Sequence, residues 1–165
     1  AKEDPFIIAN LVVTNNSAFT ETFTLTVNLP VNPTLPGGVV MGGSVTGTLT
    51  SLTGDGATLA AAQNSSIYTA LIDNNPVQTL LSDPFSQSVG AFQSGVIGPA
   101  SFGDPIPSMP GPPVLDSIGI TLEFTLSAGD SASFTSIFVV EEAVPGVGAF
   151  ALFGIAGLVT RRRRR

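Results

Sequence analysis

The strongest constraint on the fold is an almost regular alternation of apolar and polar side chains in three long segments. In residues 19–29 phenylalanine, leucine and valine occupy one parity, apart from Glu21, and the other parity is threonine and asparagine. The same pattern recurs in residues 117–126 and 131–140, and the Ser-Ala-Gly-Asp sequence between them is typical of a turn. A period of two residues places one face of a strand in a core and the other in solvent. These segments therefore predict long β-strands, the last two of which form a hairpin.

Shorter segments extend the β pattern through the rest of the first 142 residues. Residues 6–14 are apolar on both parities, as in a strand that is buried on both faces or pairs early in a sandwich. Residues 39–52 predict a glycine-rich strand, and residues 66–72 and 77–81 predict a hairpin around a turn of about four residues. Residues 86–92 predict one more short strand.

The segment 98–113 interrupts this pattern. It contains six prolines, which exclude a central strand and indicate an extended crossing loop. A loop of this length is also a candidate contact surface. We interpret it first as a plain crossover.

These strands define the expected fold class. No segment before residue 143 has the periodicity of an amphipathic helix. Seven to nine strands then predict an all-β antiparallel sandwich of jelly-roll or immunoglobulin-like type. We divide the chain into an acidic sandwich domain, residues 1–142, and a C-terminal tail, residues 143–165. Because the sequence begins with Ala1 and shows no signal peptide, we expect that a leader has been removed.

The tail joins an uncharged apolar segment to a cluster of arginines. Residues 143–160 carry no charge, and as a helix these 18 residues would be about 27 Å long, close to the thickness of a bilayer core. The apolar anchor residues are Val147, Phe150, Leu152, Phe153, Ile155, Leu158 and Val159, and the basic stop is Arg161, Arg162, Arg163, Arg164 and Arg165. Positive flanks stay cytoplasmic, so the preceding residues are expected outside the cytoplasm. The tail thus predicts a short hydrophobic helix that anchors the protein weakly or temporarily.

This order of a proline motif, an apolar segment and terminal arginines resembles the PEP-CTERM sorting signal of bacterial exosortase substrates. Val144 and Pro145 match the start of the motif, whereas Gly146 stands where the family usually has Glu. The resemblance implies secretion, membrane retention, cleavage near the proline by an exosortase, and an association with biofilm-forming bacteria. It covers about 22 of the 165 residues. An ordinary single-pass C-terminal anchor is the alternative for the same residues.

The residue types limit the chemistry that the chain can perform. Histidine and cysteine are absent, so the commonest general base, the thiolate nucleophile and the usual transition-metal ligands are missing. A carboxylate pair would have to use Glu21 and Glu123, which nothing in the sequence brings together. Apart from the terminal arginines, Lys2 is the one basic residue against twelve acidic ones, and such a body repels polyanions. We therefore predict neither an enzyme nor a nucleic-acid-binding protein.

Two further features are candidates for binding. Asp55, Asp73 and Asp130 lie in expected turns, where calcium ligands are often found, but none has the spacing of a known calcium loop. The sequence also contains two threonine rows, which are candidates for a flat hydroxyl array that binds ice or carbohydrate. These rows are Thr20, Thr22, Thr24 and Thr26, and Thr46, Thr48 and Thr50.

The sequence therefore predicts an exported, non-enzymatic surface or extracellular-matrix protein that is sorted through its tail and then anchored or released. Its expected partners are the membrane, an exosortase-like protease, and exopolysaccharide or other copies of itself, and we expect no required cofactor. A carbohydrate-binding module, assisted by calcium at the turn aspartates, is the first alternative. The second is a subunit of an extracellular fibre assembled by strand exchange, because a sheet edge can accept a strand.

Overall fold

The computed structural model describes residues 4–105 and 107–143, which form eleven strands. The strands are β1 (Phe6–Thr14), β2 (Glu21–Pro30), β3 (Val39–Thr50), β4 (Ala57–Ala60), β5 (Ser66–Ile72), β6 (Asn75–Ser82), β7 (Ser86–Val89), β8 (Ser94–Phe102), β9 (Met109–Gly111), β10 (Ser117–Leu126) and β11 (Ser131–Glu142). Within these described ranges, no helix has the length and hydrophobicity that a membrane crossing requires. The expected C-terminal helix falls on residues 144–165, which lie outside the described residues.

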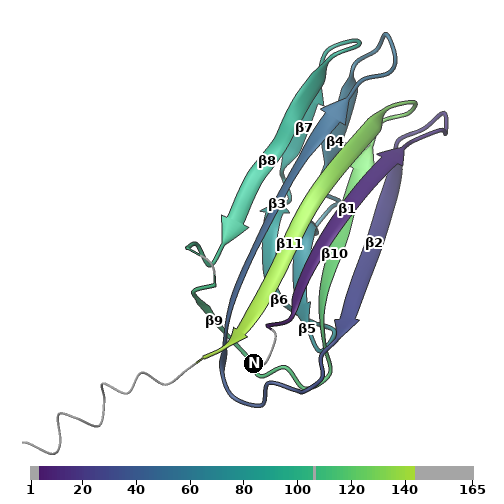
Figure 1. Cartoon of the computed structure of the whole chain (residues 1–165). Helices are drawn as coiled ribbons and strands as arrows, with labels where there is room; N and C mark the ends of the chain where they lie inside the picture. Colours follow the sequence, from purple (N-terminus) through teal and green to yellow (C-terminus); the bar gives the residue numbers. More distant parts are fainter. Residues whose placement is uncertain (1–3, 106, 144–165) are drawn as a thin grey trace, which may run out of the picture.

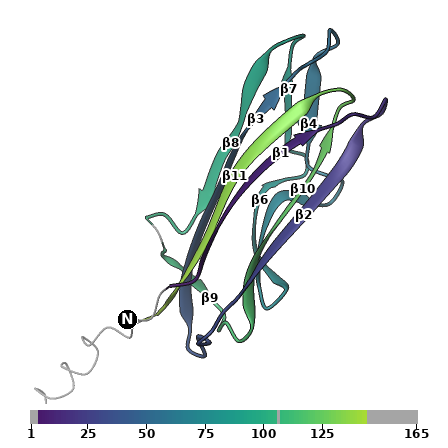
Figure 2. The same cartoon turned by 45° about the vertical axis from the view of Figure 1, so that its right-hand side comes forward.

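The strands form two antiparallel sheets that face each other, which confirms the predicted all-β sandwich (Figures 1 and 2). The predicted number of seven to nine strands is too low, because the described residues form eleven. In the first sheet, sheet A, the order is β1-β11-β3, and β8 and β9 both pair with the far edge of β3. In sheet B, β10 has β2 on one edge and β5 and β4 on the other, and β6 and β7 lie outside these. Open edges are therefore β1 and β2 on one side and β8, β9, β6 and β7 on the other.

The predicted hairpin of the last two long strands is wrong. β10 pairs with β2, β4 and β5 in sheet B, whereas β11 pairs with β1 and β3 in sheet A. The turn between them therefore crosses from one sheet to the other. Alternation specifies which face of a strand is buried, and two consecutive strands can bury those faces against each other across a core as well as side by side.

Of the two alternatives for residues 6–14, a strand buried on both faces and a strand that pairs early in a sandwich, the first is wrong. β1 has the predicted bounds, but its outward side chains Phe6, Ile8 and Val12 are 59%, 56% and 74% exposed. Residues 98–113 also differ from the predicted crossing loop, because they contribute the end of β8 and all of β9. Both are edge strands, where the missing N–H of a proline breaks no ladder hydrogen bond.

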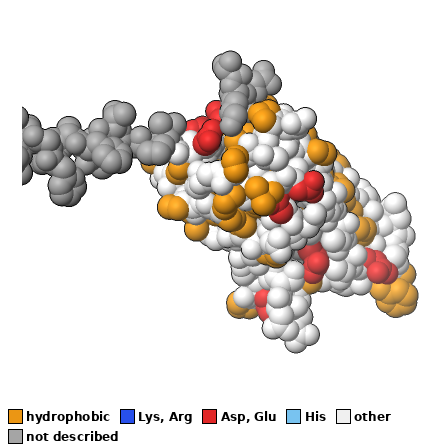
Figure 3. All heavy atoms as spheres, turned by 90° about the horizontal axis from the view of Figure 1, so that it is seen from below, with side chains coloured by type: hydrophobic (Ala, Val, Ile, Leu, Met, Phe, Trp, Pro, Cys, Tyr) orange, Lys and Arg blue, Asp and Glu red, His pale blue; other side chains and the backbone are white. Residues whose placement is uncertain are grey.

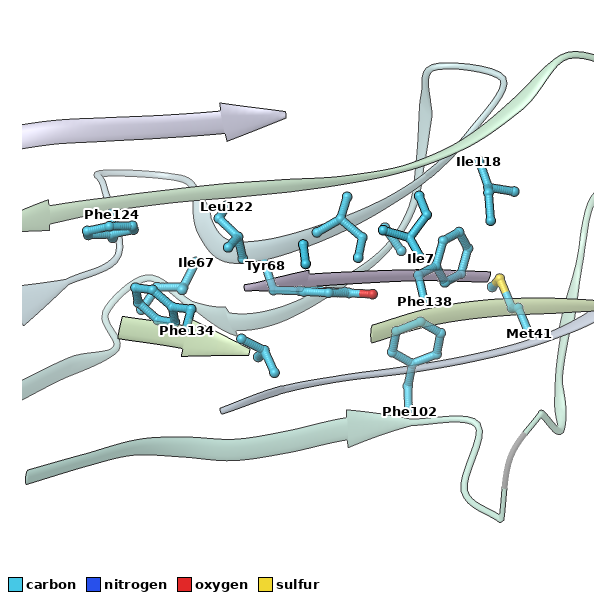
Figure 4. Close-up of a cluster of buried hydrophobic side chains, with 14 of the residues drawn as sticks. Ile7, Met41, Ile67, Tyr68, Phe102, Ile118, Leu122, Phe124, Phe134 and Phe138 are labelled. Carbon is cyan, nitrogen blue, oxygen red and sulfur yellow. The ribbon is translucent and has the colours of Figure 1, made fainter. Parts of the chain in front are cut away.

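The core lies between the sheets and is rich in aromatic rings (Figure 4). Tyr68, from β5 in sheet B, is buried, and its hydroxyl donates a 2.9 Å hydrogen bond to the carbonyl of Ile137 in sheet A. Burial raises the pKa of this hydroxyl, which keeps it protonated as a donor. Gly43 makes room for the contact, since a Cβ there would lie 2.7 Å from the Tyr68 hydroxyl.

The two ends of the sandwich contain different parts of the chain. The start of β1 and the end of β11 lie together at one end, the terminal pole, where Phe6 pairs with Val139 (Figure 1). The turns that follow β1 and β10 lie at the opposite end, the distal pole, where Asn15 N–H donates to the carbonyl of Asp130. Any segment that continues from β11 therefore leaves from the terminal pole.

Candidate interaction surfaces

The outer face of sheet A carries rows of hydroxyl side chains in register. On β3, Thr46, Thr48 and Thr50 face outwards opposite Thr135, Ser133 and Ser131 of β11. The row nearest the distal pole crosses four strands, in the order Thr14, Ser131, Thr50 and Ser94. Within it, the Thr14 hydroxyl donates to Ser131 Oγ at 3.3 Å, and the hydroxyls of Thr50 and Ser94 are 3.0 Å apart. This part of the surface is polar and uncharged.

The outer face of sheet B carries a second set of hydroxyls. One row crosses β2, β10, β5 and β6 as Thr26, Thr121, Thr69 and Thr79. The hydroxyl oxygens of Thr26 and Thr121 are 2.9 Å apart. The two predicted threonine rows therefore lie on opposite faces of the sandwich and do not form one array, and Thr20 precedes β2. Which sheet a strand joins cannot be read from its alternation.

The carboxylate of Asp73 stabilises the fold by accepting backbone hydrogen bonds. It lies in the tight turn between β5 and β6, and its carboxylate accepts the backbone N–H groups of Leu115, Asp116 and Ser117 at 3.0, 2.8 and 3.0 Å. Burial would raise the pKa of this carboxyl, but the three backbone hydrogen bonds outweigh it and hold the pKa below its usual range. The carboxylate thereby fixes the start of β10 beside the β5–β6 hairpin.

Replacing Asp73 with asparagine is expected to lower the free energy of unfolding by about 1 kcal/mol at pH 7, because hydrogen bonds to a charged acceptor become weaker bonds to a neutral one, at a site where solvent screens part of the charge. The folded-state pKa is depressed, so the stabilisation is complete above the unfolded pKa of about 3.9 and is lost as the pH falls through the folded value. The difference between the two proteins should therefore shrink in urea unfolding at pH 2–3. Asp55→Asn, at an exposed turn residue, is the matched control; an equal loss there at pH 7 would contradict the role of Asp73.

Asp130 and Asp55 lie at the distal pole. Asp130 is buried and accepts hydrogen bonds from Leu52 N–H at 3.1 Å and from the Ser127 hydroxyl at 2.6 Å. Both aspartates line one open hollow of about 490 Å³, whereas Asp73 lies at the other end of β10. Across residues 4–105 and 107–143, no three acidic side chains gather in a group that could hold a metal ion. The structure thus brings together two of the three calcium candidates and separates the third.

The two glutamates considered as a carboxylate pair face opposite ways. Glu21 lies opposite Leu126, whose side chain is in the core, whereas Glu123 lies opposite Thr24 on the outer face. Because the sheet separates their side chains, they cannot act on one bond. Their separation fits the interpretation of both as surface charges.

All the charged side chains among the described residues are acidic. They include no lysine, arginine or histidine, and acidic and apolar side chains share the surface of the terminal pole (Figure 3). Such a surface carries no counter-charge for a polyanion. The sorting motif Val144, Pro145 and Gly146, with the anchor and arginine residues after it, lies outside the described residues.

The fold defines the protein as an all-β chain with two facing antiparallel sheets. No family model matches its sequence, and no curated protein matches it. A comparison with solved structures finds a chain from the structure of infectious bursal disease virus Gx strain, with 12% sequence identity and a TM-score of 0.28. The match covers 84% of this chain and 37% of the viral chain. At that level the similarity carries no conclusion about fold or function.

Proposed function

We propose that the chain is a secreted, non-enzymatic structural protein of the bacterial cell surface or biofilm matrix, sorted through a PEP-CTERM-like tail. The observation that carries the proposal is the position of the motif relative to the fold. β11 ends at Glu142, and the motif begins at Val144 after a single intervening residue. Cleavage at the motif would therefore release the sandwich with every described strand complete.

The surface chemistry supports the same proposal. The uncharged hydroxyl rows on both outer faces suit a hydrated, polysaccharide-rich environment, and the excess of carboxylates keeps copies soluble after release. In this proposal the sandwich is an immunoglobulin-like or jelly-roll module that has a structural role at the cell surface or in the matrix. Exopolysaccharide and other copies of the chain are its proposed partners.

The proposal predicts two forms of the protein in its native host, a full-length form in membranes and a shorter form at the surface or in the medium. The shorter form is expected because a protease that reads the motif removes the apolar segment and the arginines together. Intact-mass spectrometry of each fraction would place the new C-terminus within or next to residues 144–146.

Single substitutions make the test specific. Pro145→Ala should abolish the shorter form, whereas Pro112→Ala, at an exposed proline before β10, should leave processing unchanged. Full-length protein found in membranes alone would indicate a permanent anchor and contradict release. Recovery of the protein from the cytoplasm would contradict export altogether.

A further inference from the structure

We propose that the open edge of β1 is an interface that pairs antiparallel with β1 of a second copy of the chain. Among the described strands, β1 pairs with β11 alone, so its other edge has no strand beside it. The inference concerns this edge and does not depend on the fate of the tail.

The phase of the β1–β11 ladder determines which backbone groups reach the open edge. At the two ends of the ladder, Val140 N–H donates to the carbonyl of Pro5 and Asn15 N–H donates to the carbonyl of Asp130. In an antiparallel pair the bonded positions alternate, so the odd residues of β1 turn their N–H and C=O groups to β11. The even residues turn theirs to the open edge. They are Phe6, Ile8, Asn10, Val12 and Thr14.

β1 lacks the features by which proteins usually prevent pairing at a sheet edge. Such features are charged side chains, prolines, bulges and very short strands. β1 is nine residues long, has no charge, proline or glycine, and pairs with β11 without a register shift. It is therefore a regular and unprotected template along its whole length.

The edges on the opposite side of the sandwich do carry such features. β8 contains Pro99 beside a register shift, and β6 contains Pro76 beside another. β9 and β7 are three and four residues long. β2, next to β1, has Glu21 at one end and Pro30 at the other. Of these edges, β1 is the one with none of the protective features.

The sequence of β1 is complementary to itself when two copies run antiparallel with Asn10 opposite Asn10. This register pairs all nine residues and sets the exposed Ile8 opposite Val12 of the other copy. On the inner side it sets Ile7 opposite Val13, which extends the apolar face of the core. Pairs of β-branched side chains directly opposite each other stabilise antiparallel strands. A second copy thus places an apolar side chain beside each of Ile8 and Val12, which β1 leaves in solvent.

Charge favours the antiparallel arrangement over the parallel one. Asp4, Glu141 and Glu142 lie at the terminal pole, so a parallel pair would place these carboxylates beside their copies. The antiparallel pair puts the two terminal poles at opposite ends.

Disulfide trapping in the full-length chain tests the interface, because the native sequence has no cysteine. Opposed residues of a bonded antiparallel pair have Cα atoms about 5.5 Å apart, within reach of a disulfide. Under mild oxidation in detergent, Asn10→Cys should therefore give about tenfold more covalent dimer than Thr48→Cys, which is exposed on the same face but on the interior strand β3. Thr48→Cys also reports any pairing caused by tails that share a micelle.

Two further measurements test the register and the need for an uncharged edge. Ile8→Cys should cross-link with Val12→Cys and not with itself, because two copies of residue 8 would lie about 13 Å apart in this register. Asn10→Lys should remove the dimer from light scattering, whereas Thr48→Lys should retain it.

Equal cross-linking of Asn10→Cys and Thr48→Cys, or a native chain that is monomeric at every concentration, would overturn the proposal. Self-cross-linking of Ile8→Cys in preference to the mixed pair would overturn the antiparallel register. None of these outcomes bears on tail processing, which the intact mass of the secreted form measures separately.

Discussion

Replacing Phe138 with alanine is expected to lower the free energy of unfolding by about 4 kcal/mol. Phe138 lies on β11, the strand between β1 and β3, and its side chain is fully buried. Its ring centroid is 6.2 Å from that of Phe102, which in turn is 6.3 Å from that of Tyr68 (Figure 4). Removing the ring leaves a cavity between the sheets that neighbouring strands cannot close without breaking their ladders.

Urea unfolding, followed by far-ultraviolet circular dichroism, measures this loss. The matched control is Phe92→Ala, because Phe92 is 74% exposed in the turn before β8, and its loss should stay within about 0.5 kcal/mol. Phe138→Leu keeps most of the volume and should cost about 1–2 kcal/mol, so it remains measurable if the alanine variant does not fold. Equal losses for Phe138→Ala and Phe92→Ala would contradict the described core.

The bounds of several strands could be predicted because their signal is local. Residues 6–14, 66–72 and 117–126 were expected as strands and form β1, β5 and β10 with the same limits. In each case the alternation or the apolar character is contained in the segment, and turn residues mark its ends. Strand pairing is different, because it depends on residues that are distant in the chain.

The turn after β10 shows why the pairing of β10 and β11 could not be predicted from the local sequence. A four-residue turn between two alternating strands fits a hairpin and a crossing between sheets equally well. The crossing follows from the pairing of β11 with β1 and β3, and the side chain of Asn15 stabilises it by binding the end of β10 from more than a hundred positions away in the chain. No local pattern reports such a contact.

The candidate surfaces show the same limit. Asp73 was singled out as a turn residue, and its role depends on the N–H groups of Leu115, Asp116 and Ser117, some forty positions later. The unprotected edge of β1 was also hidden, because an apolar strand at an edge and one in a sheet centre have similar compositions. The sequence-based interpretation of residues 6–14 therefore identified the strand and not its surroundings.

Asn15→Asp should be nearly as damaging as the loss of Phe138, although it changes one nitrogen atom to oxygen. Asn15 is 1% exposed, and its Nδ2 donates hydrogen bonds to the carbonyls of Phe19, Leu126 and Ser127 at 2.8, 2.9 and 3.1 Å. An aspartate would direct a buried negative charge at these carbonyl oxygens and remove the hydrogen bond that each of them receives from residue 15. We expect the free energy of unfolding to fall by about 3 kcal/mol or more at pH 7.

The pH dependence distinguishes this mechanism from a simple loss of packing. An aspartate among carbonyl oxygens ionises less readily in the folded than in the unfolded chain, so its folded-state pKa is raised. The part of the penalty that is due to the charge is then absent below the unfolded pKa of about 3.9 and grows as the pH rises towards the folded value. The gap in stability between Asn15→Asp and the native chain should therefore narrow between pH 7 and pH 4 in urea unfolding. Asn16→Asp, at the exposed next residue of the same turn, makes the same chemical change in water; if it were equally costly, burial at residue 15 would not be the cause.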